Sequence, residues 1–122
     1  MLIEPDRQVR NSIATILKAN AFETICFDSF SSFFDKVVEP TFEFDLVLTD
    51  MMDSPDDGYF VAEAAKRIHP DCRVILMRND FCRPDDEVPK HVDAVLSKPF
   101  KISELKRTIE QQYSLFIGTQ SK

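Results

Sequence analysis

The chain alternates between short apolar runs and longer segments in which apolar residues recur every three or four positions. Short unbroken apolar runs are typical of strands buried on both faces of a parallel sheet, and the wider spacing is typical of helices packed on such a sheet. The runs predicted to be strands are residues 1–3, 23–27, 46–50, 74–77 and 94–97.

Helical spacing marks four of the segments that lie between or after these runs. The predicted helices are residues 7–20, 30–38, 59–69 and 102–116. Asp6 is placed to cap the first helix, and Ser29 or Ser31 the second. A fifth segment, residues 79–90, contains Pro84 and Pro89, so we expect a short, distorted helix or mostly loop there.

Strands and helices thus alternate five times along the chain. That alternation predicts an α/β fold with a single parallel sheet, helices on both faces and right-handed crossovers. The expected strand order is 2-1-3-4-5, as in flavodoxin-like folds. We expect one domain over residues 1–117 and a polar tail over residues 118–122.

Composition narrows the possible functions. The 122 residues carry a net charge of -6, which argues against direct binding to nucleic acid or to anionic lipid. No apolar run approaches the length of a membrane span and the first residues lack the pattern of a signal peptide, so we expect a cytoplasmic protein. Cys26, Cys72 and Cys82 lack the spacing of metal ligands and are expected to be buried free thiols.

Four charged residues that end or follow apolar runs are candidates for chemistry: Glu4, Asp50, Arg78 and Lys98. The carboxyl ends of parallel strands share one rim of a sheet, and α/β proteins bind ligands there. In the expected strand order Glu4 and Asp50 are neighbours, with Lys98 and Arg78 beside them. One interpretation is an ion-pair cluster without chemistry. The other is a phosphoryl-acceptor site, in which cations neutralise the charge on the phosphoryl oxygens.

The residues around two of these positions follow a recognisable spacing. Asp57-Gly58 follows Asp50 by seven and eight residues, and the fifth run leads into Lys98-Pro99-Phe100. Within five strand-helix repeats, this pattern resembles the response-regulator receiver domain of two-component signalling. The resemblance implies that Asp50 accepts a phosphoryl group from the phosphohistidine of a histidine kinase, that Lys98 contacts this group, and that the Lys-Pro bond is cis. It implies a phosphorelay module that is not an enzyme beyond its own phosphorylation and dephosphorylation.

The resemblance also implies a Mg²⁺ site, and here the sequence departs from the family. An acidic pair closes the first strand in the family, but this chain has Glu4-Pro5, and proline offers no side-chain oxygen. The remaining ligands would be Glu4, Asp50 and the main-chain carbonyl of Met52, with waters completing the shell. We therefore expect Mg²⁺ to bind weakly or not at all.

Arg78 stands where the family has a threonine or serine, and Val95 stands where it has a mobile aromatic residue. A guanidinium cannot act as a small movable hydroxyl donor, which leaves two roles open. Arg78 could pair with Asp50 or Glu4 at rest, giving a non-phosphorylated pseudo-receiver that acts as a protein interaction module. It could instead hold the phosphoryl oxygens and partly replace the metal charge. We favour the resting ion pair.

The resemblance also implies the partners. A histidine kinase or a phosphotransfer protein would supply the phosphoryl group. The last helix and residues 79–90 are the expected contact surface for an output domain or for a second copy of the chain. His69 and His91 stand alone in the sequence and are expected at the surface.

Overall fold

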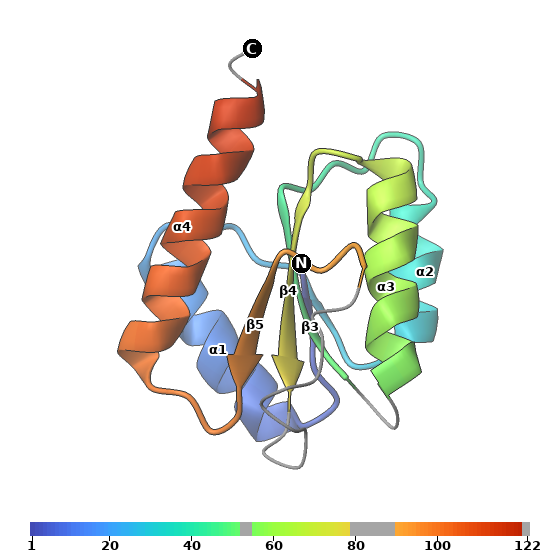
Figure 1. Ribbon diagram of the computed structural model, residues 1–122. Helices are drawn as coiled ribbons and strands as arrows, with labels where there is room; N and C mark the ends of the chain where they lie inside the picture. Colours follow the sequence, from blue (N-terminus) through green and yellow to red (C-terminus); the bar gives the residue numbers. More distant parts are fainter. Residues whose placement is uncertain (52–54, 79–89, 121–122) are drawn as a thin grey trace.

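A parallel sheet lies between two layers of helices in the computed structural model, which describes residues 1–51, 55–78 and 90–120 (Figure 1). The strands are β1 (Leu2–Ile3), β2 (Cys26–Phe27), β3 (Leu46–Asp50), β4 (Arg73–Arg78) and β5 (Ala94–Ser97). They pair in the order β2-β1-β3-β4-β5, and every pair is parallel. The predicted fold class and strand order are confirmed.

Helices cover both faces of the sheet. Those in the described residues are α1 (Arg7–Ala19), α2 (Phe30–Val37), α3 (Pro55–Ile68) and α4 (Ile102–Gln120). Helices α1 and α4 lie on one face and α2 and α3 on the other (Figure 1). The short or distorted helix predicted within residues 79–90 falls almost entirely outside the described residues.

The apolar residues of the strands alternate between two cores, as strands buried on both faces require. The core under α2 and α3 takes Val47, Val74 and Leu76 from β3 and β4. The core under α1 and α4 takes Leu48, Ile75 and Met77 from the same strands. Fully burying side chains of this size contributes about 1.5–3 kcal/mol each. The sheet is therefore a rigid support for whatever its strand ends carry.

The first two helices are capped as the sequence predicts. The Asp6 carboxylate accepts hydrogen bonds from the main-chain N–H groups of Gln8 at 2.9 Å and Val9 at 3.0 Å. The Ser29 hydroxyl accepts one from the N–H of Ser32 at 3.2 Å. Each cap contributes about 1 kcal/mol and fixes where the chain turns from a strand into a helix.

Helix α3 begins earlier than predicted. It starts at Pro55 and not at Tyr59, because proline is accommodated in the first turn of a helix. Gly58 therefore lies inside the helix, where an added Cβ would come within 2.7 Å of the Leu76 side chain. The glycine allows α3 to pack closely on β4.

The bounds of two other elements also differ from the prediction. Helix α4 continues to Gln120, past the predicted end at Phe116, so residues 118–120 of the predicted tail are helical. Strand β2 spans only Cys26–Phe27 of the predicted residues 23–27. The apolar pattern marks only the packed part of a helix, and the exposed residues 117–120 continue α4 beyond it.

Some predictions of burial were wrong. Val38, the last apolar residue of the predicted helix 30–38, follows α2 as its C-cap and is 68% exposed. Cys26 is exposed, whereas Cys72 is buried, and both thiols are free. Cys82 lies outside the described residues.

Candidate functional site

The carboxyl ends of β1 and β3 place two acidic side chains next to each other. Ile3 pairs with Thr49 in the parallel register, so Glu4 and Asp50 are the next residues on adjacent strands. Glu4 is 2% exposed and Asp50 is 5% exposed. Because buried carboxylates are costly without partners, this part of the rim requires a cation.

Lys98 supplies that cation from just beyond β5. Its Nζ donates hydrogen bonds to Asp50 Oδ1 at 2.7 Å and to Glu4 Oε2 at 2.9 Å and Oε1 at 3.1 Å. The Lys98–Pro99 peptide bond is cis, as the resemblance implied. The structure thus brings Glu4, Asp50 and Lys98 together at one rim of the sheet.

The pKa values of this group reflect one ammonium held between two buried carboxylates. Burial lowers the pKa of Lys98, but its hydrogen bonds to Asp50 and Glu4 outweigh burial and raise the pKa above its ordinary value. Burial raises the pKa of Glu4, and the hydrogen bonds from Lys98 offset this only in part. Lys98 is therefore charged at neutral pH, and positive charge already occupies the space between the carboxylates.

Arg78 reaches the same rim on the other face of the sheet. Alternation along β4 places Arg78 with Leu76, on the side of α2 and α3. The same alternation places Glu4, Asp50 and Lys98 on the side of α1 and α4. Within the described part of the chain, Arg78 forms no ion pair with either carboxylate. The predicted resting pair between Arg78 and Asp50 is not present; Lys98 holds both acids instead. We call Glu4, Asp50, Arg78 and Lys98 the carboxyl rim.

The donor set at the carboxyl rim does not fit a divalent cation well. Glu4 and Asp50 both bind Lys98, and Pro5 adds no ligand oxygen. Residues 1–51, 55–78 and 90–120 contain no group of three His, Cys, Asp or Glu side chains that could hold a metal ion. The Met52 carbonyl, the third predicted ligand, lies outside these residues. The side chains in place suit a resident lysine better than Mg²⁺.

The sequence pattern did not indicate a role for Arg10, although its side chain stabilises the turn that carries Glu4. Its Nη1 donates to the carbonyl oxygen of Glu4 at 2.9 Å and to that of Pro5 at 3.3 Å. The position of Arg10 one turn after the Asp6 cap was a usable signal. A long basic side chain there can turn back toward the strand that the helix follows.

A second polar cluster lies at the opposite, amino-terminal edge of the sheet. The Asp93 carboxylate binds Lys66 at 2.8 Å, Arg73 at 3.5 Å and the main-chain N–H of Val74 at 2.8 Å. Buried Gln112 accepts a hydrogen bond from Arg73 Nε at 2.9 Å. We call Lys66, Arg73, Asp93 and Gln112 the amino-edge cluster; it joins α3, β4 and α4.

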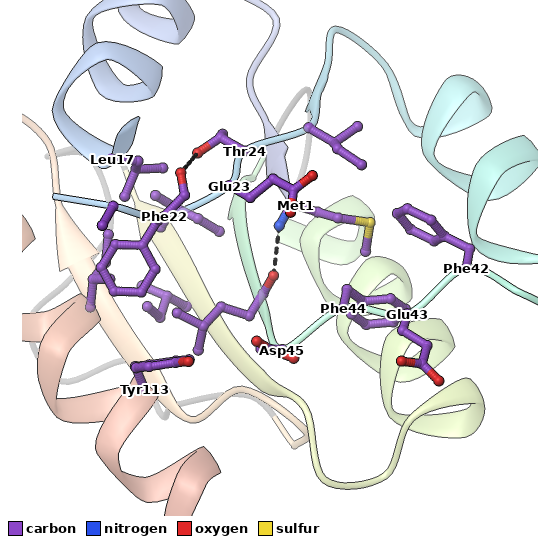
Figure 2. Close-up of a pocket in the computed structure, with 16 residues that line it drawn as sticks. Met1, Leu17, Phe22, Glu23, Thr24, Phe42, Glu43, Phe44, Asp45 and Tyr113 are labelled. Atoms are coloured by element: carbon purple, nitrogen blue, oxygen red, sulfur yellow. Dashed lines mark hydrogen bonds between the residues drawn. The ribbon is translucent and has the colours of Figure 1, made fainter. Parts of the chain in front are cut away.

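A cavity of about 530 Å³ opens at the amino-terminal edge as well (Figure 2). Its walls include Leu17, Phe22, Phe44 and Tyr113. Asp45, which also lines the cavity, lies just before β3, whereas Asp50 ends that strand. The cavity is therefore separate from the carboxyl rim.

The histidines take part in neither polar cluster. His69 is half-buried, with Nε2 at 3.2 Å from the carbonyl oxygen of Phe42, and His91 is exposed as predicted.

No helix in the described stretches is long and apolar enough to cross a membrane.

Comparison with known proteins gives relatives in both sequence and structure, although no protein-family model matches the chain. The chain is 29% identical over 114 residues to the response regulator receiver protein CpdR of Brucella abortus, covering 91% of this chain and 92% of that protein. A CheY-like response regulator receiver domain protein from Methanospirillum hungatei has a TM-score of 0.82 at 19% identity, covering 97% of this chain and 94% of that one. The beryllofluoride-activated NtrC4 receiver domain dimer has a TM-score of 0.78 at 19% identity, covering 94% and 95%.

The strand order and the lysine-bridged acids at the carboxyl rim agree with the resemblance to receiver domains that the sequence shows. The similarity to CpdR extends over nearly the whole chain, and the fold is that of CheY-like proteins. The chain is accordingly similar in sequence to a response-regulator receiver protein and shares the fold of receiver domains.

Proposed function

We propose that the chain accepts a phosphoryl group on Asp50 from the phosphohistidine of a histidine kinase or of a phosphotransfer protein. The observation that carries this proposal is the 2.7 Å contact between Lys98 Nζ and Asp50 Oδ1. A half-buried ammonium at that distance is positioned to neutralise charge on the oxygens of an arriving phosphoryl group. Asp50 ends a strand of the rigid sheet, so its carboxylate is held in place.

The phosphoryl group passes from an imidazole nitrogen of the donor to a carboxylate oxygen of Asp50. A carboxylate oxygen of Asp50 attacks phosphorus and forms an O–P bond while the P–N bond of the phosphohistidine breaks. The electron pair of that bond stays on the imidazole, which takes up a proton. Lys98 stabilises the charge that builds up on the phosphoryl oxygens, and Glu4 keeps Lys98 at the rim through its contacts at 2.9 and 3.1 Å.

Intact-mass spectrometry with a small phosphodonor tests this proposal. We expect wild type to gain roughly 80 Da, the mass of one phosphoryl group, and Asp50→Asn to gain nothing. Asp28→Asn is the matched control, because Asp28 is an exposed aspartate that follows β2 at the same edge of the sheet. Labelling that survives in Asp50→Asn would place the acceptor elsewhere.

We also propose that α4 carries the surface for an output domain or a second copy. Leu115 and Ile117, near the end of α4, are 48% and 46% exposed. The similar NtrC4 receiver domain is a dimer in its beryllofluoride-activated form. Light scattering after size-exclusion chromatography, with and without phosphodonor, tests the second copy. Leu115→Glu should abolish a dimer that Lys106→Glu, an exposed substitution on the same helix, leaves intact.

A further inference from the structure

Arg78 ends β4 with a buried polar atom that lacks a partner. Its Nε is buried and forms no hydrogen bond with any residue that the structure describes. A buried donor without an acceptor costs stability, and native proteins keep few of them. An acceptor that arrives with a ligand explains why one is kept here.

The strand register places this atom beside the acceptor. Asp50 pairs with Met77 across β3 and β4, so Arg78 is its diagonal neighbour. Arg78 pairs in turn with Ser97, and its carbonyl oxygen accepts a hydrogen bond from the main-chain N–H of Lys98 at 2.6 Å. Neighbouring strands lie about 4.8 Å apart, and an extended arginine side chain is longer than that spacing. A group that stands above the rim on Asp50 therefore comes within reach of Arg78.

The chemistry of the guanidinium selects the kind of group. Arginine is always charged and presents its N–H donors as a planar fork that matches phosphate oxygens. The carboxylate of Asp50 faces Lys98, on the side of α1 and α4, whereas Arg78 comes from the other face. A phosphoryl group is larger and has three acceptor oxygens, so it can contact both cations at once.

The same arrangement disfavours a divalent cation. Lys98 places a positive charge between the two carboxylates, and Arg78 adds a second one at the end of the neighbouring strand β4, so a metal ion would be repelled. Pro5 provides no ligand oxygen to offset that repulsion. The positive charge that a phosphoryl group needs is thus present in side chains.

We propose that Arg78 is the anion-binding group of this site, and that the acceptor therefore works without a divalent cation. Its guanidinium binds the oxygens of the phosphoryl group on Asp50, satisfies Nε in doing so and supplies the charge in place of Mg²⁺. This inference rests on the proposed function of Asp50 as acceptor.

The rate of phosphoryl incorporation in EDTA and in Mg²⁺ is the first test. Wild type labels at the same rate in both buffers. Arg78→Thr labels at least about tenfold more slowly in EDTA, because it loses a charge-assisted pair of hydrogen bonds, and Arg78→Lys falls between them. Arg107→Thr, the same substitution at an exposed position of α4, keeps the wild-type rate. Wild-type labelling that requires Mg²⁺, or an Arg78→Thr rate in EDTA equal to that of wild type, overturns the inference.

A binding measurement separates this inference from the acceptor proposal. In Asp50→Asn the acceptor is uncharged, so inorganic phosphate in EDTA at constant ionic strength should raise Tm through Lys98 and Arg78. The rise disappears when Arg78→Thr is added and persists with Arg107→Thr. If phosphate raises Tm in this way but neither wild type nor any variant is labelled, anion binding by Arg78 stands, and the acceptor proposal fails together with the claim about Mg²⁺. If wild type labels only with Mg²⁺ and phosphate leaves Tm unchanged, the acceptor proposal stands and the role of Arg78 fails.

Discussion

The carboxyl rim and the amino-edge cluster lie at opposite ends of the same sheet and contain similar residues, yet they are built differently. At the amino edge, Asp93 binds Lys66, Arg73 and a main-chain N–H. Gln112 there accepts a hydrogen bond from Arg73 Nε. At the carboxyl rim, Lys98 is shared between two carboxylates. There Arg78 has a buried Nε with no acceptor among the residues that the structure describes.

The difference separates a cluster that holds the fold together from one that suits a ligand. A polar network whose members all have partners makes a structure rigid and stable. A cluster in which two acids share one cation and a buried donor has no acceptor lowers the stability of the fold. Such a loss of stability is typical of functional sites. Removing the arginine at one end of the sheet should therefore change stability in the opposite direction to removing the arginine at the other end.

The largest effect is expected for Lys98→Met. The rate of phosphoryl incorporation should fall about 100-fold or more, because the ammonium that neutralises the developing charge is lost. The thermal midpoint should fall too, since two buried carboxylates lose their cation. Initial rates by intact mass check the prediction, with Lys101→Met, an exposed lysine nearby, as control. An unchanged rate would identify the carboxyl rim as an inert ion-pair cluster.

Asp93→Ala should give the largest loss of stability at the amino edge. It leaves Lys66, Arg73 and a main-chain N–H without their carboxylate. We expect the free energy of unfolding to fall by about 2–3 kcal/mol, less than for a fully buried pair because the Lys66 and Asp93 side chains are 17% exposed. Urea denaturation measures this, with Asp45→Ala as exposed control. The labelling rate per folded molecule should not change, and a large change would mean that the two clusters are coupled.

A matched pair of arginine substitutions should give opposite signs. Arg78→Met should stabilise the fold by about 1–2 kcal/mol, because it removes a buried donor without an acceptor. Arg73→Met should destabilise it by about 1 kcal/mol, because Gln112 and Asp93 lose a partner. Urea denaturation of both variants gives the comparison directly. Changes of equal sign would remove the distinction between the two ends of the sheet.

The smallest effect is a pH dependence that belongs to Glu4. Burial raises the pKa of Glu4 in the folded state, so the folded protein binds this proton more tightly than the unfolded chain does. Stability from this group is present at acidic pH and is lost as pH rises through the raised pKa. Glu4→Gln should lack this slope in urea denaturation between pH 4 and pH 7. A slope that persists in Glu4→Gln must come from another group.

Much of the carboxyl rim follows from the pattern of the sequence. Unbroken apolar runs identified the strands, and the charged residue after each run identified what lies at the rim. The partner of Asp50 was misjudged because alternation along the strands was not applied to the strand ends. Counting by two from Leu76 puts Arg78 on the opposite face from the carboxylates, and counting by two from Leu96 puts Lys98 on theirs.

Other features depend on contacts that the pattern does not encode. The need for glycine at position 58 follows from the close approach of α3 to Leu76, which only the structure shows. The amino-edge cluster was missed, although Asp93 and Arg73 both stand at the amino-terminal start of neighbouring strands. Charged residues there meet for the same reason as those at the carboxyl ends, but Gln112 joins them only through the packing of α4.

The single ammonium shared by Glu4 and Asp50 ties the first strand to the third. If the Lys98 ammonium moves toward one of the two carboxylates, its hydrogen bonds to the other lengthen. Arg10 of α1 donates a hydrogen bond to the main-chain carbonyl oxygen of Glu4 and so holds this turn against the helix. Charge added at Asp50 therefore acts on the hydrogen bonds of Lys98. Through Glu4 and Arg10 these bonds connect Asp50 to the start of α1, and through Lys98 itself they connect it to the end of β5.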